Sequence, residues 1–384
     1  MPRTAGRSLF FCALKPAFAP SERCPRSYDQ LRLELGPDAG APHCALLSSH
    51  DDHRLLAALP GRARVVTQLR RPLDRLLSAY EFTVEVASRT AFTAKRPNPS
   101  RAPERTDTTQ VWPWSVLVPL LRTDMHARWV ARGRRAPPRP PPGDDQQGGY
   151  SSPFVLSLLQ FVEHPAVRDV LHNGASYQLL GVTNNTARSG DAPADARHAR
   201  TAQRLRLCAR EAPMAARAMQ AMAAQRLRQE VAVVSLKERL DGSVALLAAT
   251  LERPLSGGAY RSGGDAKEAQ QRAALERNPA AQQALDRGER DGSPGALARA
   301  YRHCEKRQRE RMAARRGRAL ERLRYDDGSQ LSFDRARVPA AVRAAVEREN
   351  ALDVALYQLG SQLFQEREAA LRSAGRWESL DDVT

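Results

Sequence analysis

Two short runs of branched aliphatic residues, each followed at once by a helical pattern, constrain the fold of this chain more than any other feature. Residues 64–69 (Arg-Val-Val-Thr-Gln-Leu) and 231–236 (Val-Ala-Val-Val-Ser-Leu) have the length and the β-branched content of buried strands. Pro72 suits the first turn of a helix, and apolar residues then recur at helical spacing at Leu73, Leu76, Leu77 and Tyr80. Strands that alternate with helices predict an α/β fold with a mostly parallel sheet, which places ligands beyond the carboxyl ends of its strands.

The remaining patterns predict a single domain that carries insertions. A third short strand is expected at residues 178–183, and helices are expected over 201–229, 241–252 and 339–372. Compositionally biased segments at about 93–150, 185–200 and 256–338 are interpreted as disordered or helical insertions. The domain then spans residues 1–372, and residues 373–384 form a C-terminal tail.

The chain is strongly basic, with 60 Lys and Arg against 43 Asp and Glu and a formal net charge of +17. An excess of this size favours a polyanionic partner, although a biased Arg, Ala and Pro composition would also account for it. Aromatic residues are only 5%, and no basic strand carries the paired aromatics that stack on RNA bases, so a nucleic-acid partner is not expected. No apolar run approaches the ~20 residues that span a bilayer.

The cysteines and tryptophans leave alternatives open. Five cysteines show neither a C-x-x-C pair nor zinc-ligand spacing, so no metal is expected and at most two disulfides fit. Three tryptophans, Trp112, Trp114 and Trp129, lie in the first insertion. They have the chemistry to stack on sugar faces, but packing in a core is the commoner role of such a cluster.

Two loops carry residues suited to anion binding. Residues 2–9 (Pro-Arg-Thr-Ala-Gly-Arg-Ser-Leu) combine small side chains, which let backbone N–H groups approach an anion, with the charges of Arg3 and Arg7. In residues 69–80, Arg70 precedes a helix and Ser78 lies two turns into it, away from the leucine face. Arginine donors and a hydroxyl at a helix start can hold a phosphate. The competing interpretations are a basic N-terminal loop and an amphipathic helix with a solvated arginine face.

These loops resemble motifs of the carbohydrate sulfotransferases. Residues 2–9 are similar to the 5′-phosphosulfate loop P-K-T-G-G-T-S-L, and residues 69–80 to the 3′-phosphate motif L-R-D-P-x-x-R-x-x-S-x-Y. Residues 43–60 resemble the stretch in which the heparan sulfate 6-O-sulfotransferases carry a catalytic histidine. Residues 236–243 and 349–357 resemble the family's L-T-E-R-L-D-E-S and E-N-x-L-D-x-x-L-Y segments.

The resemblance implies a P-loop-like three-layer sandwich that transfers a sulfuryl group from 3′-phosphoadenosine 5′-phosphosulfate to a glycan hydroxyl. Donor binding would fall to Arg3, Thr4, Ala5, Gly6, Arg7, Ser8 and Leu9 at the 5′ end and to Arg70 and Ser78 at the 3′-phosphate. Arg3 would stabilise charge on the leaving phosphate, and His50 would take the hydroxyl proton, with His53 as the second candidate base. The acceptor would be a polyanionic or neutral polysaccharide.

The resemblance also implies a location and leaves other functions open. Family members work in the Golgi lumen behind a membrane anchor and begin with a buried strand, so we expect a strand and an anchor to be missing before Met1 and the sheet to have a gap beside the donor site. Arg3, Ala5, Arg7 and Arg71 depart from the family's Lys, Gly, Thr and Asp. The alternatives are an inactive relative that binds nucleotide or glycan, and a basic nucleic-acid-binding scaffold.

Overall fold

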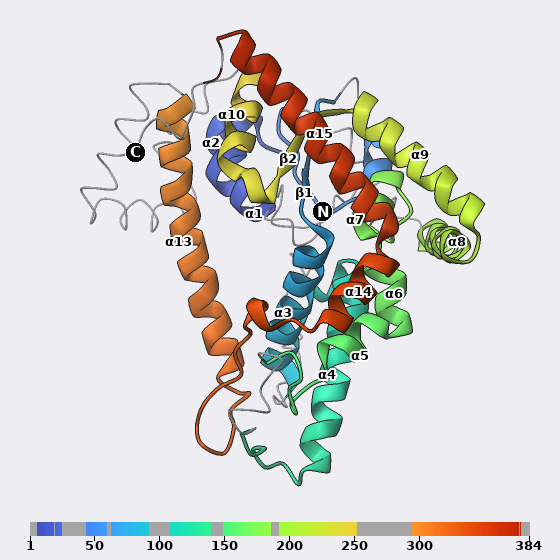
Figure 1. Ribbon diagram of the computed structural model, residues 1–384, viewed down its shortest axis with the longest axis vertical. Coiled ribbons are helices and arrows are strands. Elements are labelled where there is room, and N and C mark those ends of the chain that lie inside the picture. Colours follow the sequence, from blue (N-terminus) through green and yellow to red (C-terminus); the bar gives the residue numbers. More distant parts are fainter. Residues whose placement is uncertain are drawn as a thin grey trace.

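The protein is a mixed α/β structure in which a small parallel sheet is surrounded by helices (Figure 1). The computed structural model describes residues 6–18, 20–24, 44–59, 63–91, 108–139, 149–185, 192–251, 294–375 and 377. Within them, two predicted strands are confirmed, β1 (Val65–Leu69) and β2 (Val231–Leu236), and they pair in parallel. Gln68 lies opposite Ser235 and Leu69 opposite Leu236, so the carboxyl ends of the two strands lie side by side.

Helices cover both faces of the sheet. On one face lies α15 (Ala351–Ser373), because a Cβ built at Gly360 would stand 2.4 Å from a Leu69 methyl and 3.3 Å from a Val234 methyl. Figure 1 shows α10 (Leu240–Leu251), α1 (Gly6–Leu9) and α2 (Lys15–Ala17) on the other side of the strands. The apolar residues of the sheet and of these helices form one hydrophobic core.

A second hydrophobic core lies in the helices beyond the end of β1. There α3 (Pro72–Ala91) packs lengthwise against α4 (Trp114–Ala131) and against α14 (Ala340–Glu349). Trp112 and Trp114 are buried in this core, so packing is the role that the structure assigns to them. Part of the segment expected as the first insertion therefore builds the core.

Shorter helices and three long peripheral helices complete the structure. The long ones are α8 (Ala192–Glu211), which continues into α9 (Pro213–Gln229), and α13 (Pro294–Leu320). The shorter ones are η1 (Phe10–Leu14), η2 (Pro20–Glu22), η3 (His53–Ala58), η4 (Thr108–Gln110), α5 (Leu158–Glu163), α6 (Pro165–Val170), α7 (Gly174–Leu180), η5 (Lys237–Arg239) and η7 (Arg335–Arg337).

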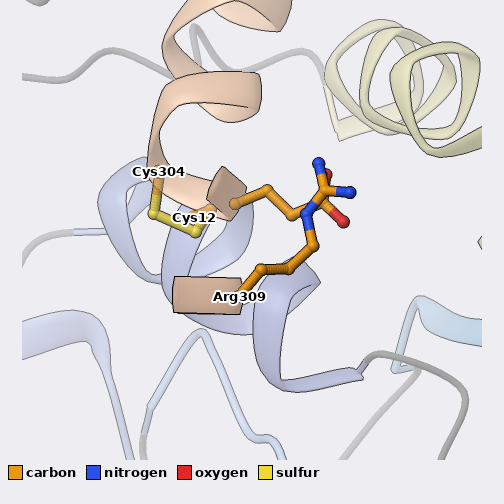
Figure 2. The surroundings of a disulfide bond; sticks show 4 residues. Cys12, Cys304 and Arg309 are labelled. Atoms are coloured by element: carbon orange, nitrogen blue, oxygen red, sulfur yellow. A yellow bond between two sulfur atoms is a disulfide. The ribbon is translucent and has the colours of Figure 1, made fainter. Parts of the chain in front are cut away.

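Two disulfides tie distant parts of the chain together. Cys12 is bonded to Cys304 and Cys24 to Cys44, whereas Cys208 is free and exposed. Figure 2 shows the first bond, which fastens η1 to α13, with Arg309 just over a turn further along that helix. Two disulfides are the most that the cysteine count allows.

The predicted strand at 178–183 is wrong, because residues 174–180 form α7. Its N-terminus is held by Asp353, which accepts hydrogen bonds from the backbone N–H groups of Ala175 and Ser176. Its C-terminus ends at Gly181, whose φ of 70° is left-handed. A short apolar run does not by itself distinguish a strand from a buried helical turn.

The other helical predictions are confirmed with two breaks. The 201–229 helix is interrupted before Pro213 and the 339–372 helix at Asn350. Two strands among the described residues establish a parallel α/β core but not the larger sandwich of the resemblance. None of the described helices is both long enough and apolar enough to cross a bilayer.

Candidate functional site

The turn from β1 into α3 carries the predicted 3′-phosphate residues. Arg70 follows the last residue of β1 and is half-buried, and Ser78 is buried two turns into the helix. Burial, and then the positive charge of Arg335, lower the pKa of the Arg70 guanidinium, but an arginine keeps its charge at neutral pH. A cation is therefore fixed beside the N-terminus of a 20-residue helix, where the backbone dipoles also favour an anion.

Acidic residues of α3 near this turn are already paired with arginines. Glu81 is 1% exposed and accepts hydrogen bonds from Arg335 (Nε 2.7 Å, Nη2 2.8 Å), from Arg316 Nη1 (3.2 Å) and from the Tyr150 hydroxyl (2.9 Å). Burial alone would raise the pKa of Glu81, but the hydrogen bonds and charges of these arginines hold it below its ordinary value. Glu81 thus stays ionised as an anchor, and Arg335 is held beside Arg70.

Polar contacts hold the carboxyl ends of β1 and β2 together. Glu238, just after β2, accepts a hydrogen bond from the Arg71 backbone N–H (3.0 Å) and another from the Tyr357 hydroxyl of α15 (3.0 Å). The neighbouring Lys237 Nζ lies 3.2 Å from Glu305 of α13. The 236–243 and 349–357 segments therefore meet at the strand ends, where they fix the position of the turn that carries Arg70.

The first anion-binding loop is described only in part. Arg3, Thr4 and Ala5 lie outside the described residues, whereas Gly6, Arg7, Ser8 and Leu9 already form α1, so the expected loop is helical from Gly6 onward. Ser8 and Leu9 are buried, and Leu9 packs in the same hydrophobic core as Leu69. The Cys12–Cys304 bond fastens the continuation of α1 to α13 (Figure 2). Leu9, at the end of this segment, therefore packs with the sheet whose strand end carries Arg70.

The two candidate bases lie in a segment that packs against α7. The His50 carbonyl accepts a hydrogen bond from Gln178 Nε2 (3.1 Å), and the His50 ring is half-buried. His53 Nε2 lies 2.9 Å from Glu230 Oε2, and burial followed by the charge of Arg226 lowers the pKa of His53. His53 is thus engaged at the end of α9, and His50 stays the predicted base.

Asp52, between the two histidines, has a structural role. It accepts hydrogen bonds from the Arg54 N–H (3.1 Å) and from the Thr183 hydroxyl (2.8 Å), and so caps η3. Burial raises its pKa to about 6 in spite of these hydrogen bonds.

A cleft of about 620 Å³ lies beside β1. Its lining includes residues 65–67 of β1 and residues 45–49, but no residue of β2. Most of its lining residues are apolar, and the polar ones include Ser49, Asp51, His53 and Gln178. The residues on either side of His50 line the cleft, whose size is typical of small-molecule sites.

The sequence patterns did not single out two polar residues inside the sheet. Gln68 of β1 and Ser235 of β2 are buried opposite one another, and their side chains make no hydrogen bond. In the sequence these positions could have been noticed as a glutamine and a serine within two runs of mainly aliphatic residues. Among the described residues, no group of three His, Cys, Asp or Glu side chains has the arrangement of a metal site.

Comparison with known proteins bears on the chemistry of this site. Over 193 residues the chain is 37% identical to a protein-tyrosine sulfotransferase of Arabidopsis thaliana, and the match covers 48% of this chain and 37% of that protein. The match supports a sulfotransferase family. The chain thus spans well under half the length of the relative that it matches. No family model and no solved structure matches the chain.

The relative supports the sulfotransferase part of the resemblance, but not its carbohydrate branch in particular. The name of that relative specifies protein tyrosine as the group modified, whereas the motifs of this sequence resemble enzymes that modify glycans. Both acceptor classes present a hydroxyl group.

Proposed function

We propose that this protein transfers a sulfuryl group from 3′-phosphoadenosine 5′-phosphosulfate to an acceptor hydroxyl. The observation that carries the proposal is the turn from β1 into α3, where Arg70 stands at a strand end beside a long helix's N-terminus with Ser78 buried behind it. Similarity to a sulfotransferase supports the proposal independently. The acids nearest to Arg70 are engaged by arginines, a tyrosine and backbone N–H groups.

In the proposed reaction the residues of this chain position the donor and stabilise charge. Arg70 and Ser78 hold the 3′-phosphate, the residues from Arg3 to Leu9 hold the 5′ end, and Arg3 stabilises the charge on the leaving phosphate. His50 accepts the proton of the acceptor hydroxyl as the oxygen bonds to sulfur and the sulfur–oxygen bond to the leaving phosphate breaks. A neutral imidazole has a ring nitrogen with a free lone pair, which can accept this proton.

For the acceptor, we propose a tyrosine side chain bound in the cleft beside β1. Leucines dominate the cleft walls (Leu46, Leu55, Leu56, Leu179 and Leu251), and such walls suit an aromatic ring better than a sugar. Thr67 lines the cleft three residues before Arg70, about 10 Å away along an extended strand. The cleft therefore lies beside the strand whose end is proposed to hold the donor. A glycan, which the sequence motifs favour, is the second candidate.

We also propose that the protein works in an oxidising compartment such as the lumen of the Golgi. The two disulfides support this, since such bonds persist in secretory compartments and are rare in the cytosol.

Transfer of labelled sulfate from the donor to two acceptors tests the function. One acceptor is an acidic peptide with a single tyrosine, and the other is desulfated heparan sulfate. We expect label on the peptide, and loss of most activity in Arg70→Ala and Ser78→Ala. The matched control is Arg315→Ala, which removes an exposed arginine from α13.

Each outcome has a distinct meaning. Label on the polysaccharide alone would replace the tyrosine acceptor with a glycan. Tight binding of 3′-phosphoadenosine 5′-phosphate without transfer to either acceptor would indicate an inactive nucleotide-binding relative. An absence of both binding and transfer would refute the proposal.

A further inference from the structure

Two neighbouring polar side chains in the sheet lack the hydrogen bonds that buried groups normally make. Gln68 is 5% exposed and Ser235 is 1% exposed, and they lie opposite one another in the register of β1 and β2. The Gln68 Oε1 and Nε2 atoms and the Ser235 Oγ atom are all buried and have no partner. Because an unpaired buried polar group destabilises a fold, such groups are rare in native proteins, and a valine at either position would avoid the penalty.

The two side chains lie on the face of the sheet opposite α15. Leu69 and Val234 face α15, since both contact the position of a Cβ at Gly360. Successive side chains of a strand point to opposite faces, so Gln68 and Ser235 point away from α15. Figure 1 shows α1 and α10 on that side of the strands.

The position of this pair matches the donor rather than the acceptor. Gln68 lies two residues before Arg70, at the end of the strand where the donor is expected. Figure 1 shows α1, which contains Gly6, Arg7, Ser8 and Leu9, on that side of the strands, and Leu9 belongs to the same hydrophobic core as the strand residues Leu69 and Val233. The residues of α1 are among those to which the proposed function assigns the 5′ end of the nucleotide.

We infer that Gln68 and Ser235 bind the 5′ phosphosulfate end of the donor nucleotide from the floor of the site. The Gln68 Nε2 group supplies two N–H donors and the Ser235 hydroxyl supplies one, and phosphate oxygens accept them. The inference rests on the proposed function. It explains why two unpaired polar groups are kept inside an aliphatic sheet, since their partner arrives with the nucleotide.

Two variants and two matched controls test the inference. Gln68→Leu and Ser235→Ala remove the unpaired groups. Gln178→Leu removes a buried glutamine whose Nε2 donates to the His50 and Asp51 carbonyls, although its Oε1 has no partner. Ser243→Ala removes a buried serine that is hydrogen-bonded to the Leu236 N–H and the Arg239 carbonyl. Melting temperatures and calorimetric Kd values are measured for all four, with 3′-phosphoadenosine 5′-phosphate and with adenosine 3′-phosphate, which lacks the 5′ group.

The expected results separate a binding role from a structural one. The test variants should melt roughly 1 to 4 °C above the wild type, and the controls below it. Gln68→Leu should weaken binding of 3′-phosphoadenosine 5′-phosphate by about tenfold and binding of adenosine 3′-phosphate by less than about twofold. Arg70→Ala should weaken binding of both nucleotides.

Three results would overturn the inference. If the two test variants lose stability as the controls do, the pair is satisfied within the protein. If they are more stable but bind both nucleotides as the wild type does, the pair is not part of the donor site, and the proposed function is unaffected. If the wild type binds neither nucleotide, the proposed function is wrong as well.

Discussion

Asp353 is the residue whose loss should damage this fold most. Its carboxylate is 3% exposed and accepts four hydrogen bonds, from Arg75 Nη2 (2.7 Å), from the Ala175 N–H (3.1 Å), and from the N–H and the hydroxyl of Ser176 (2.8 Å each). It therefore joins α15 to the first turn of α3 and to the start of α7. In Asp353→Ala, the Arg75 charge stays buried without its counter-ion and α7 loses its cap.

The cost follows from the burial of both partners. The side chains of Arg75 and Asp353 are 4% and 2% exposed, and removing one partner of such a pair costs about 3 to 5 kcal/mol. Urea unfolding followed by circular dichroism should show this loss, and thermal unfolding should show a drop in Tm of roughly 4 to 6 °C for a chain of this length. The double variant Arg75→Met, Asp353→Ala should be more stable than Asp353→Ala, because it leaves no unpaired buried charge.

An exposed ion pair provides the control for the Asp353 experiment. Arg302 and Asp241 are 45% and 36% exposed, so Arg302→Ala should cost about 0 to 1 kcal/mol. The reasoning is refuted if Asp353→Ala costs no more than this control, or if the double variant is as unstable as the single one.

Three further predictions concern packing, pH and covalent links. Gly360→Ala should destabilise the protein by about 1 to 3 kcal/mol, because the new Cβ would collide with a leucine methyl of β1. The control Gly317→Ala has open space around it in α13 and should stabilise the protein by about 0.4 to 1 kcal/mol. Equal effects of the two substitutions in urea unfolding would contradict the packing of α15 against β1. Burial lowers the pKa of His172 from 6.5 to about 4, so the stability that its neutral ring contributes is intact above pH 6.5, and up to about 3 kcal/mol of it is lost as the pH falls to 4. The difference in unfolding free energy between the wild type and His172→Gln should change over that pH range. A difference independent of pH would contradict the proposed burial of the neutral ring. Breaking the Cys12–Cys304 bond with Cys12→Ser should lower the free energy of unfolding by about 2 to 4 kcal/mol. A reductant should lower the Tm of the wild type more than that of the variant. If Cys12→Ser has the same Tm as the wild type, η1 and α13 are held together by packing alone.

The local sequence correctly predicted secondary structure where its own pattern and the tertiary environment favour the same conformation. The β-branched runs at 65–69 and 231–236 are strands, and Pro72 begins α3 as its fixed φ angle suggests. In each case the chain's own propensity and its burial favour the same conformation.

The error at residues 178–183 has a cause that lies elsewhere in the chain. Asp353, more than 170 residues away, satisfies the first N–H groups of α7, and Gly181 ends it in a left-handed conformation. Hydrophobic periodicity within one segment contains no information about a distant capping carboxylate. The breaks at Pro213 and Asn350 could be read more easily, since both residue types commonly end or begin helices.

Some residues of the candidate site could likewise be predicted from local sequence, and others could not. Arg70 and Ser78 were recognisable because they flank a strand end and a helix start that local pattern predicts. Arg335, Arg316 and Tyr150, which surround Glu81, come from segments that had been interpreted as insertions. Their proximity to α3 depends on how α13 and η7 pack, which no local motif specifies.

The net charge of +17 is weaker evidence for a polyanionic partner than it seems from composition alone. Arg206 is 1% exposed and is engaged by Asp169 (Nη2 to Oδ2, 2.9 Å) and by the Val182 carbonyl (2.8 Å). Arg367 donates to backbone carbonyls of β2, and Arg335 is bound to Glu81. Arginines of this kind stabilise the fold and have their donors occupied, so they contribute little to attracting a partner. Composition therefore does not identify the acceptor, and the proposal of a tyrosine acceptor depends instead on the leucines that line the cleft beside β1.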